Sequence, residues 1–241
     1  AVAVVLRNPD MRRLQLAWLG ASLSIWAFAI ALGVYAFDVG GATAVGVAAL
    51  VRLLPGALVS PLAGLLGDRH ARRSVLLASA LGATAVLACA TTAAALGAPA
   101  GVVFALGGLF TVAVSPYVPA EGALMPVVAR TPQELSAANV AHSVMDNLGF
   151  LAGSVMTGIL LATTSPEVAF GLAAAAAGVS EALLAGLGRD RRPEYAAAPA
   201  AAGVLAETAE GARALLADRT IRVVGAGLTL LLFFEGAADV L

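Results

Sequence analysis

Residues 64–76 read GLLGDRHARRSVL, and they place a dense group of charges between two long apolar runs. The apolar runs, residues 42–66 and 74–96, each exceed the roughly 20 residues that a helix needs to cross the hydrocarbon of a bilayer. Arginines near the ends of spanning helices mark the side of the membrane that was not translocated. The stretch therefore predicts a tight cytoplasmic turn between two transmembrane helices, and its charges are Asp68, Arg69, Arg72 and Arg73.

The composition points to the same class of protein. Of the 241 residues, 60% are hydrophobic and 12% are charged, whereas about a quarter of the residues in a typical soluble domain are charged. The chain has one cysteine, Cys89, so it cannot form an intramolecular disulfide. We predict an all-helical integral membrane protein, with no metal site, no cofactor and no nucleic-acid partner.

Seven apolar runs follow one another along the chain. Short turns separate the first six, whereas a polar, charged segment precedes the seventh. We therefore divide the chain into a six-helix transmembrane part at residues 1–188, a cytoplasmic linker at 189–222, and a seventh span at 223–241. The seventh span would be the start of a second, C-terminal transmembrane half. The first six spans are predicted at residues 14–37, 42–66, 74–96, 101–129, 133–161 and 168–187.

The arginines predict the orientation of these spans. All 14 basic residues are arginines. When the N-terminus is placed in the cytoplasm, every arginine except Arg52 falls in a cytoplasmic segment, and the three outer turns contain none. Because positive charge accumulates in short cytoplasmic loops, we predict a multi-pass protein of the plasma membrane whose N-terminus is cytoplasmic.

Residues 64–73, GLLGDRHARR, resemble the signature loop G-x-x-x-D-R-x-G-R-R between the second and third helices of the major facilitator superfamily. Ala71 stands where the family usually has glycine, and alanine is strained at the positive φ that glycine adopts freely. In the family, the acid and the arginines of this loop latch the two halves of the protein together on the cytoplasmic face. The alternative is a solvated turn that only sets the topology. The resemblance assigns the latch to Gly64, Asp68, Arg69, Arg72 and Arg73.

A second resemblance covers residues 130–139, RTPQELSAAN, and the glycines that follow, Gly149, Gly153 and Gly158. This part is similar to the loop and fifth helix of exporter-like actinobacterial members of the family. The family's antiporter motif, G-x-x-x-G-P-x-x-G-G, maps onto residues 149–158 without its proline and one of its glycines. Small residues at this spacing let helices approach closely, and ordinary packing is the alternative to a dedicated role in antiport.

The resemblance implies a fold and a function. The fold is the six-helix N-terminal half of a major facilitator protein, built from two inverted repeats of three helices and followed by the linker and the seventh span. The implied function is secondary active transport by alternating access, with proton-coupled efflux of a small amphipathic or drug-like molecule. The partners would be this substrate, protons, membrane lipid and the C-terminal half of the same protein. A chain that pairs with a second copy of itself is the alternative architecture.

Two other functions are compatible with this fold: a lipid flippase, and a membrane sensor or structural subunit that does not transport. An enzyme is not expected. The chain lacks the glycine-rich phosphate loop followed by lysine that a built-in ATPase needs.

Charged groups inside the spans are the candidates for coupling transport to protons. A charge at the middle of the bilayer costs roughly 3 kcal/mol or more, so we expect it to have a partner or a function. On the fifth span Asn139, His142 and Asp146 recur at i, i+3 and i+7, on one helical face that continues into Gly149. We expect Asp146 to exchange a proton, with Arg52 or His142 tuning it. The full set of candidates is Asp146, Arg52, His142, Glu121 and Glu235.

Simpler interpretations exist for several of these side chains. His142 lies near enough to the cytoplasm to be a helix-end histidine, and Arg52 could be a structural pair. Trp18 is interpreted as an anchor at the membrane interface. Aromatic residues make up only 5% of the chain and are widely scattered, so they do not predict a substrate cage.

Overall fold

The structure, a computed structural model, describes Val5, residues 7–188 and, farther along, residues 213, 217, 221–227 and 230, without the side chains of residues 61–69. The chain divides into two compact units, residues 1–196 and 197–241. In the second unit the described residues are helical. Glu235 and most of the predicted linker lie outside the described residues.

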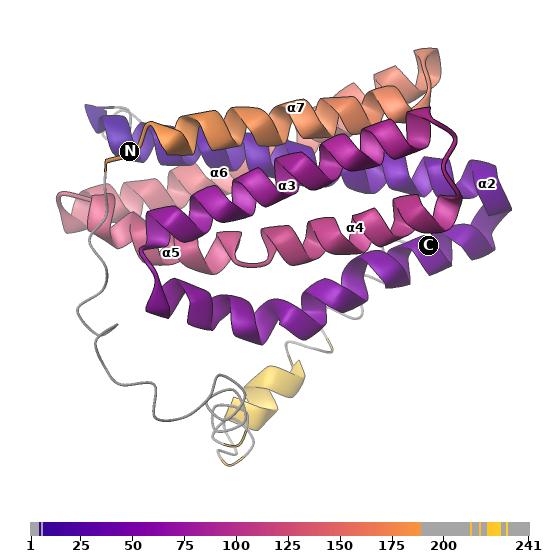
Figure 1. Cartoon of the computed structure of the whole chain (residues 1–241). Coiled ribbons are helices and arrows are strands. Elements are labelled where there is room, and N and C mark those ends of the chain that lie inside the picture. Colours follow the sequence, from indigo (N-terminus) through magenta and orange to yellow (C-terminus); the bar gives the residue numbers. More distant parts are fainter. Residues whose placement is uncertain are drawn as a thin grey trace. The chain divides into compact units, whose positions relative to one another are not determined.

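Six helices with defined bounds make up the first unit, and none of its described residues belongs to a strand. Figure 1 shows these helices side by side in one bundle. The first of them packs against the third, fifth and sixth, and the second packs against the third and sixth. The prediction of an all-helical fold is therefore confirmed. The helices are α2 (Pro9–Arg69), α3 (Arg72–Ala95), α4 (Ala100–Val114), α5 (Tyr117–Val128), α6 (Pro132–Thr163) and α7 (Pro166–Ala185).

The first two predicted spans form the single element α2, which is broken at Gly40 and Gly41. An unbroken helix of 61 residues would be about 90 Å long, whereas the hydrocarbon of a bilayer is about 30 Å thick. Gly41 has φ 63° and ψ −156°, a conformation that is essentially restricted to glycine. The chain turns back at this point, as the two arms of α2 in Figure 1 show. The turn falls where the sequence predicts it, and α2 contains two crossings.

The fourth predicted span is a pair of helices, α4 and α5, and not one continuous helix. Pro116 lies at the junction and has no N–H with which to bond the carbonyl oxygen of Val112. The hydroxyl of Ser115 donates to that oxygen instead, at 2.9 Å. The prediction of one crossing at residues 101–129 is confirmed, because α4 and α5 together form an apolar stretch, Ala100–Val128, that is long enough to span a membrane. The sequence does not predict that this crossing is divided at Pro116.

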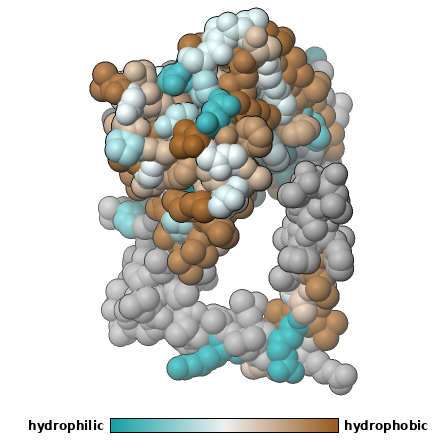
Figure 2. Space-filling view, turned by 90° about the vertical axis from the view of Figure 1, so that its right-hand side faces the viewer, coloured by the Kyte–Doolittle hydropathy of each residue, from teal (hydrophilic) through white to brown (hydrophobic). Residues whose placement is uncertain are grey.

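Five of the described helical stretches are long and apolar enough to cross a membrane, and the first of them, Pro9–Ser60, contains the break at Gly41. The unit therefore provides six crossings. Large apolar side chains such as Phe37 and Leu58 are exposed on its surface, as expected for residues that face lipid. Figure 2 looks onto the end of the bundle where α3 joins α4, and it shows apolar residues over much of this face, mixed with polar ones.

Aromatic packing holds the middle of the bundle together. Phe28 of α2 is fully buried, and its ring lies 5.1 Å from that of Phe110 in α4 and 5.3 Å from that of Phe170 in α7. Rings at these distances and inclined to one another gain about 0.5–1.5 kcal/mol per pair beyond the area they bury. The three phenylalanines therefore fix the first crossing against the fourth and the sixth.

α6 approaches α2 closely at two glycines of the predicted packing motif. A Cβ atom at Gly149 would lie 2.6 Å from Cβ of Ser22, and one at Gly153 would lie 2.8 Å from the carbonyl oxygen of Leu23. Gly158 is different, because it is exposed and a Cβ atom there would have no neighbour within 4 Å among the described residues. Nine residues of α-helix turn through about 900°, so Gly158 points away from the face of Gly149. The predicted packing contact is thus absent at Gly158 in this unit.

Candidate functional site

A buried acid on α5 faces a histidine on α6. The side chain of Glu121 is 1% exposed, and its Oε1 lies 3.3 Å from Nδ1 of His142. The His142 side chain is 28% exposed, so the pair extends from the interior of the bundle toward its surface. The other oxygen of Glu121, Oε2, is buried and has no hydrogen-bond partner among the described residues. A negative charge on Glu121 would therefore be compensated mainly by His142.

Aromatic side chains from α2 and α5 lie against this pair. The ring of Trp18 stacks on His142, with centroids 4.8 Å apart and 21° between the ring planes. Trp18 also contacts the ring of Tyr117 at 5.6 Å. The hydroxyl of Tyr117 lies 3.2 Å from that of Ser180 in α7. These contacts join four helices around Glu121.

The structure corrects two simpler interpretations of these residues. Trp18 is only 7% exposed, so it is a packed residue of the bundle and not an anchor at the membrane interface. His142 is paired and stacked, so it is more than a solvated histidine at a helix end. Neither contact was predictable from local sequence, because the partners come from three different helices.

Asp146 lies one turn beyond His142 on α6. Its Oδ1 accepts a hydrogen bond from the hydroxyl of Ser22 at 3.1 Å, and the same hydroxyl lies 3.2 Å from the carbonyl oxygen of Asp146. Ser22 is also the residue against which Gly149 packs. Asp146 therefore lies at the contact between α2 and α6, whereas Asn139, from the same predicted face, is exposed.

Arg52 lies apart from this cluster. It belongs to the second arm of α2 and lines a cavity of about 130 Å³ together with Leu32 and Ala48. Within the described part of the chain, no hydrogen bond or ion pair joins Arg52 to Asp146. Direct tuning of Asp146 by Arg52 therefore has no contact in this structure to support it.

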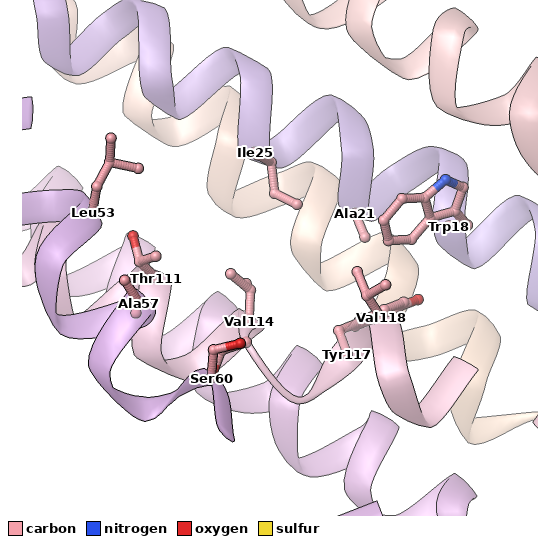
Figure 3. A pocket seen from close by; sticks show the side chains of 12 residues that line it. Trp18, Ala21, Ile25, Leu53, Ala57, Ser60, Thr111, Val114, Tyr117 and Val118 are labelled. Atoms are coloured by element: carbon pink, nitrogen blue, oxygen red, sulfur yellow. The ribbon is translucent and has the colours of Figure 1, made fainter. Parts of the chain in front are cut away.

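An apolar pocket of about 440 Å³ opens beside the cluster. Its walls come from both arms of α2, from α4 and from α5 (Figure 3). Trp18 and Tyr117 lie at one end of the pocket and Leu53 at the other, and hydroxyl groups contribute only a few polar atoms. The volume falls in the range of small-molecule sites, about 300–1,000 Å³. The scattered aromatic residues do not predict this pocket, because folding brings Trp18 and Tyr117 together from distant parts of the chain.

The predicted latch is described only in part. Arg72 begins α3, and Nη2 of Arg73 donates to the carbonyl oxygen of Ala185 at the end of α7, at 2.8 Å. Ala71 has φ −58° and ψ 123°, an extended conformation that any residue adopts, so alanine in the glycine position carries no strain here. The latch residues whose side chains lie outside the described residues are Gly64, Asp68 and Arg69.

A second buried polar cluster, which is not among the predicted site residues, lies at the start of α6. Glu134 is 4% exposed, and its carboxylate accepts hydrogen bonds from Nδ2 of Asn8 at 2.7 Å and from the backbone N–H of Arg130 at 2.8 Å. Asn8 also donates to the carbonyl oxygen of Val128 at 3.0 Å. The sequence does carry a signal, since Thr131 caps the helix three residues before Glu134. The cluster ties the start of α2 to the loop between α5 and α6.

Comparison with known proteins identifies the family. The family profile described as Major Facilitator Superfamily matches residues 16–238. No curated protein and no solved structure matches the chain. Members of this family are generally not enzymes. The match extends over nearly the whole chain, and the matched region contains six apolar crossings in an all-helical unit. The chain therefore belongs to the Major Facilitator Superfamily and is a multi-pass membrane transporter.

Proposed function

We propose that this chain is the N-terminal half of an exporter-like transporter, which moves a small amphipathic molecule out of the cell in exchange for protons. The observation that carries the proposal is the apolar pocket that ends at Trp18, because the same side chain stacks on the buried pair of Glu121 and His142. The candidate substrate site and a group that can bind a proton thus share one wall.

The lining of the pocket supports an amphipathic substrate. Trp18, Ile25 and Tyr117 offer apolar and aromatic surface, whereas Ser60 and Thr111 offer hydroxyl groups. Pockets of this kind bind ligands mainly through their apolar surface and orient them with a few polar contacts. The C-terminal half would close the pocket from the opposite side, so that alternating access opens it to one side of the membrane at a time.

The acids in the bundle support coupling to protons. Ionisable residues inside a membrane are costly and usually mark a path for ions or protons. Glu121 is buried between helices, and Asp146 is bonded across the contact of α2 and α6. Gly149 and Gly153 bring the same two helices together. A change in the charge of either acid would therefore act on contacts between helices, which is what alternating access requires.

We propose that the protein lies in the plasma membrane, and its arginines support an orientation with the N-terminus in the cytoplasm. Figure 1 shows the start of α2, the start of α3 and the loop between α5 and α6 at the same end of the bundle. Arg13, Arg73 and Arg130 belong to these three segments. We propose that this end is cytoplasmic and that Asp68 and its neighbouring arginines latch the chain to its second half there.

Transport by the purified full-length protein in proteoliposomes tests the proposal. With amphipathic dyes as probes and a pH indicator inside the vesicles, we expect dye and protons to move in opposite directions, and we expect a protonophore to abolish accumulation. Leu53→Trp, which fills the end of the pocket away from Trp18, should reduce transport. Its control is Leu50→Trp, on the same arm of α2 but outside the pocket lining.

Three results would contradict the proposal. Flux that does not respond to the pH gradient would exclude antiport with protons. Binding of dyes without flux would favour a sensor, and movement of a fluorescent phospholipid between leaflets would favour a flippase.

A further inference from the structure

We propose that Glu121 and His142 form the proton-binding site of this transporter, and that Trp18 links the occupancy of the apolar pocket to this site. The inference rests on the proposed function. It adds to that function the residues that hold the proton and the side chain through which proton and substrate act on each other.

The geometry of the pair accounts for the uptake of one proton. When His142 is neutral, its Nδ1–H can donate to Oε1 of Glu121, 3.3 Å away, and the pair carries one negative charge. Uptake of one proton at Nε2 converts the imidazole into an imidazolium, and the pair becomes neutral overall. Release from Nε2 restores the negative charge, and no other bond changes. Burial favours the neutral pair, because Oε2 of Glu121 has no donor among the described residues.

The surroundings of the pair contain few other charges. Asp146 is the nearest acid on α6, and it is bonded to the hydroxyl of Ser22. On α5, Tyr117 is bonded to Ser180 of α7. Trp18, which stacks on His142, belongs to an apolar cluster that also contains Leu14 of α2 and Leu76 of α3. Among the described residues, no arginine forms an ion pair with Glu121 or His142.

The two acids, Glu121 and Asp146, differ in their hydrogen-bond partners. Asp146 accepts a hydrogen bond from a side chain that also packs against Gly149, so its position follows the contact of α2 and α6. Glu121 has His142 as its only side-chain partner among the described residues. The partly exposed imidazole gives the buried carboxylate a route for proton exchange, whereas Asp146 is itself partly exposed and is held by Ser22.

Trp18 connects the pair to the pocket. Its ring stacks on His142 at 4.8 Å, and it also lines the pocket next to Tyr117 (Figure 3). The face of an indole attracts a cation, so the stacked ring stabilises the imidazolium. A substrate that displaces the indole removes this stabilisation and favours release of the proton. By linkage, protonation weakens substrate binding by the same factor, about 2- to 30-fold for a contact of this kind.

Fluorescence of Trp18 tests the inference without any transport, because a protonated imidazole stacked on an indole quenches its emission. The sample is the full-length protein in lipid nanodiscs with every tryptophan except Trp18 replaced by phenylalanine, which in this chain means Trp26→Phe. We expect emission to fall as the pH is lowered. His142→Gln should abolish this transition. Glu121→Gln should move its midpoint by about one pH unit or more, and Asp146→Asn should move it less.

The link to the substrate needs a second measurement. Tetraphenylphosphonium serves as a non-fluorescent amphipathic probe, and its affinity should be lower at the acidic end of the transition than at the alkaline end. We expect Trp18→Leu, and also Trp18→Phe, which fills more of the space of the indole, to reduce this difference in affinity. Circular dichroism and thermal unfolding check that both variants fold. An affinity that is equal at both ends in the unaltered protein would refute the role of Trp18.

The outcomes distinguish this inference from the proposed function. A pH transition that persists in His142→Gln, or one that Asp146→Asn abolishes and Glu121→Gln leaves in place, would overturn the assignment of the proton site. Proton-coupled flux that survives in both Glu121→Gln and His142→Gln would also overturn it, and would leave the proposed function standing. Flux without proton movement in the unaltered protein would refute the proposed function itself.

Discussion

Replacing Gly153 by alanine should loosen the contact between α6 and α2. The new Cβ atom would lie 2.8 Å from the carbonyl oxygen of Leu23 and 3.3 Å from both the backbone nitrogen of Ala27 and Cβ of Trp26. The nearest of these atoms belongs to the backbone, so no rotation of a side chain relieves the clash. The two helices would have to separate by about 0.6 Å before the closest contact reached an ordinary 3.4 Å.

A control on another helix isolates the cost of this clash. Overpacking of a close contact costs about 1–3 kcal/mol, whereas alanine gains up to about 1 kcal/mol over glycine in a helix interior. Gly153→Ala should therefore lower the free energy of unfolding by up to about 2 kcal/mol. A Cβ atom at Gly178 in α7 would lie 3.8 Å from Thr84, an ordinary contact, so Gly178→Ala should show only the gain in propensity. The difference between the two variants, about 1–3 kcal/mol, measures the overpacking alone.

Unfolding of the full-length protein in mixed micelles by a denaturing detergent, followed by circular dichroism, gives both free energies. Each variant is compared with the unaltered protein at the same micelle composition. If the two variants differ by less than about 0.5 kcal/mol, which is the range of ordinary surface substitutions, the close approach of α6 to α2 at Gly153 is wrong.

Three further predictions concern the turn, the start of the bundle and the pocket. Gly41→Ala should destabilise the protein by about 1–3 kcal/mol because of its backbone conformation, whereas the helical Gly46→Ala, which meets no neighbour, should not; equal unfolding midpoints would contradict the break described in α2. Asn8→Ala should lower the free energy of unfolding by about 1–3 kcal/mol, because it removes a donor from the buried Glu134. A double-mutant cycle with Glu134→Ala should then give a coupling energy clearly different from zero, and a value near zero would contradict the contact. Tyr117→Phe, which removes the hydroxyl bonded across to α7, should cost about 1 kcal/mol in thermal unfolding and leave dye transport measurable; complete loss of transport would show that the hydroxyl acts on the substrate.

The sequence predicts the crossings well, because the length of an apolar run is set directly by the thickness of the membrane. The turn before the second span is correctly placed at Gly40 and Gly41, where glycine supplies a backbone conformation that other residues avoid. The division of the fourth span is not predicted. Proline occurs inside spanning helices as well as at their ends. The hydrogen bond from the Ser115 hydroxyl to the carbonyl oxygen of Val112 depends on the side-chain rotamer of Ser115, which the sequence does not specify.

The candidate site shows where prediction from the sequence stops. Periodicity places His142, Asp146, Gly149 and Gly153 near one face of the same helix, and these are local relations that a 3.6-residue repeat specifies. It cannot specify that Glu121 and Trp18 meet this face, since those contacts depend on how α5 and α2 pack against α6. Gly158 points away from the face of Gly149, and matching a motif letter by letter does not specify the direction in which each residue points.

The junction between α4 and α5 gives the fourth crossing a mechanical property that a continuous helix lacks. Across Ser115 and Pro116 the ladder of backbone hydrogen bonds is interrupted, and a side-chain hydroxyl takes over one carbonyl oxygen. Tilting α5 on this joint would leave the helical hydrogen bonds on either side intact. It would act instead on the contacts that α5 makes with its neighbours, Tyr117 with Ser180 and Glu121 with His142. Because α5 carries Tyr117 and Glu121, such a tilt would swing one wall of the pocket and the buried acid through the same arc, while α4 stayed fixed against the phenylalanine core.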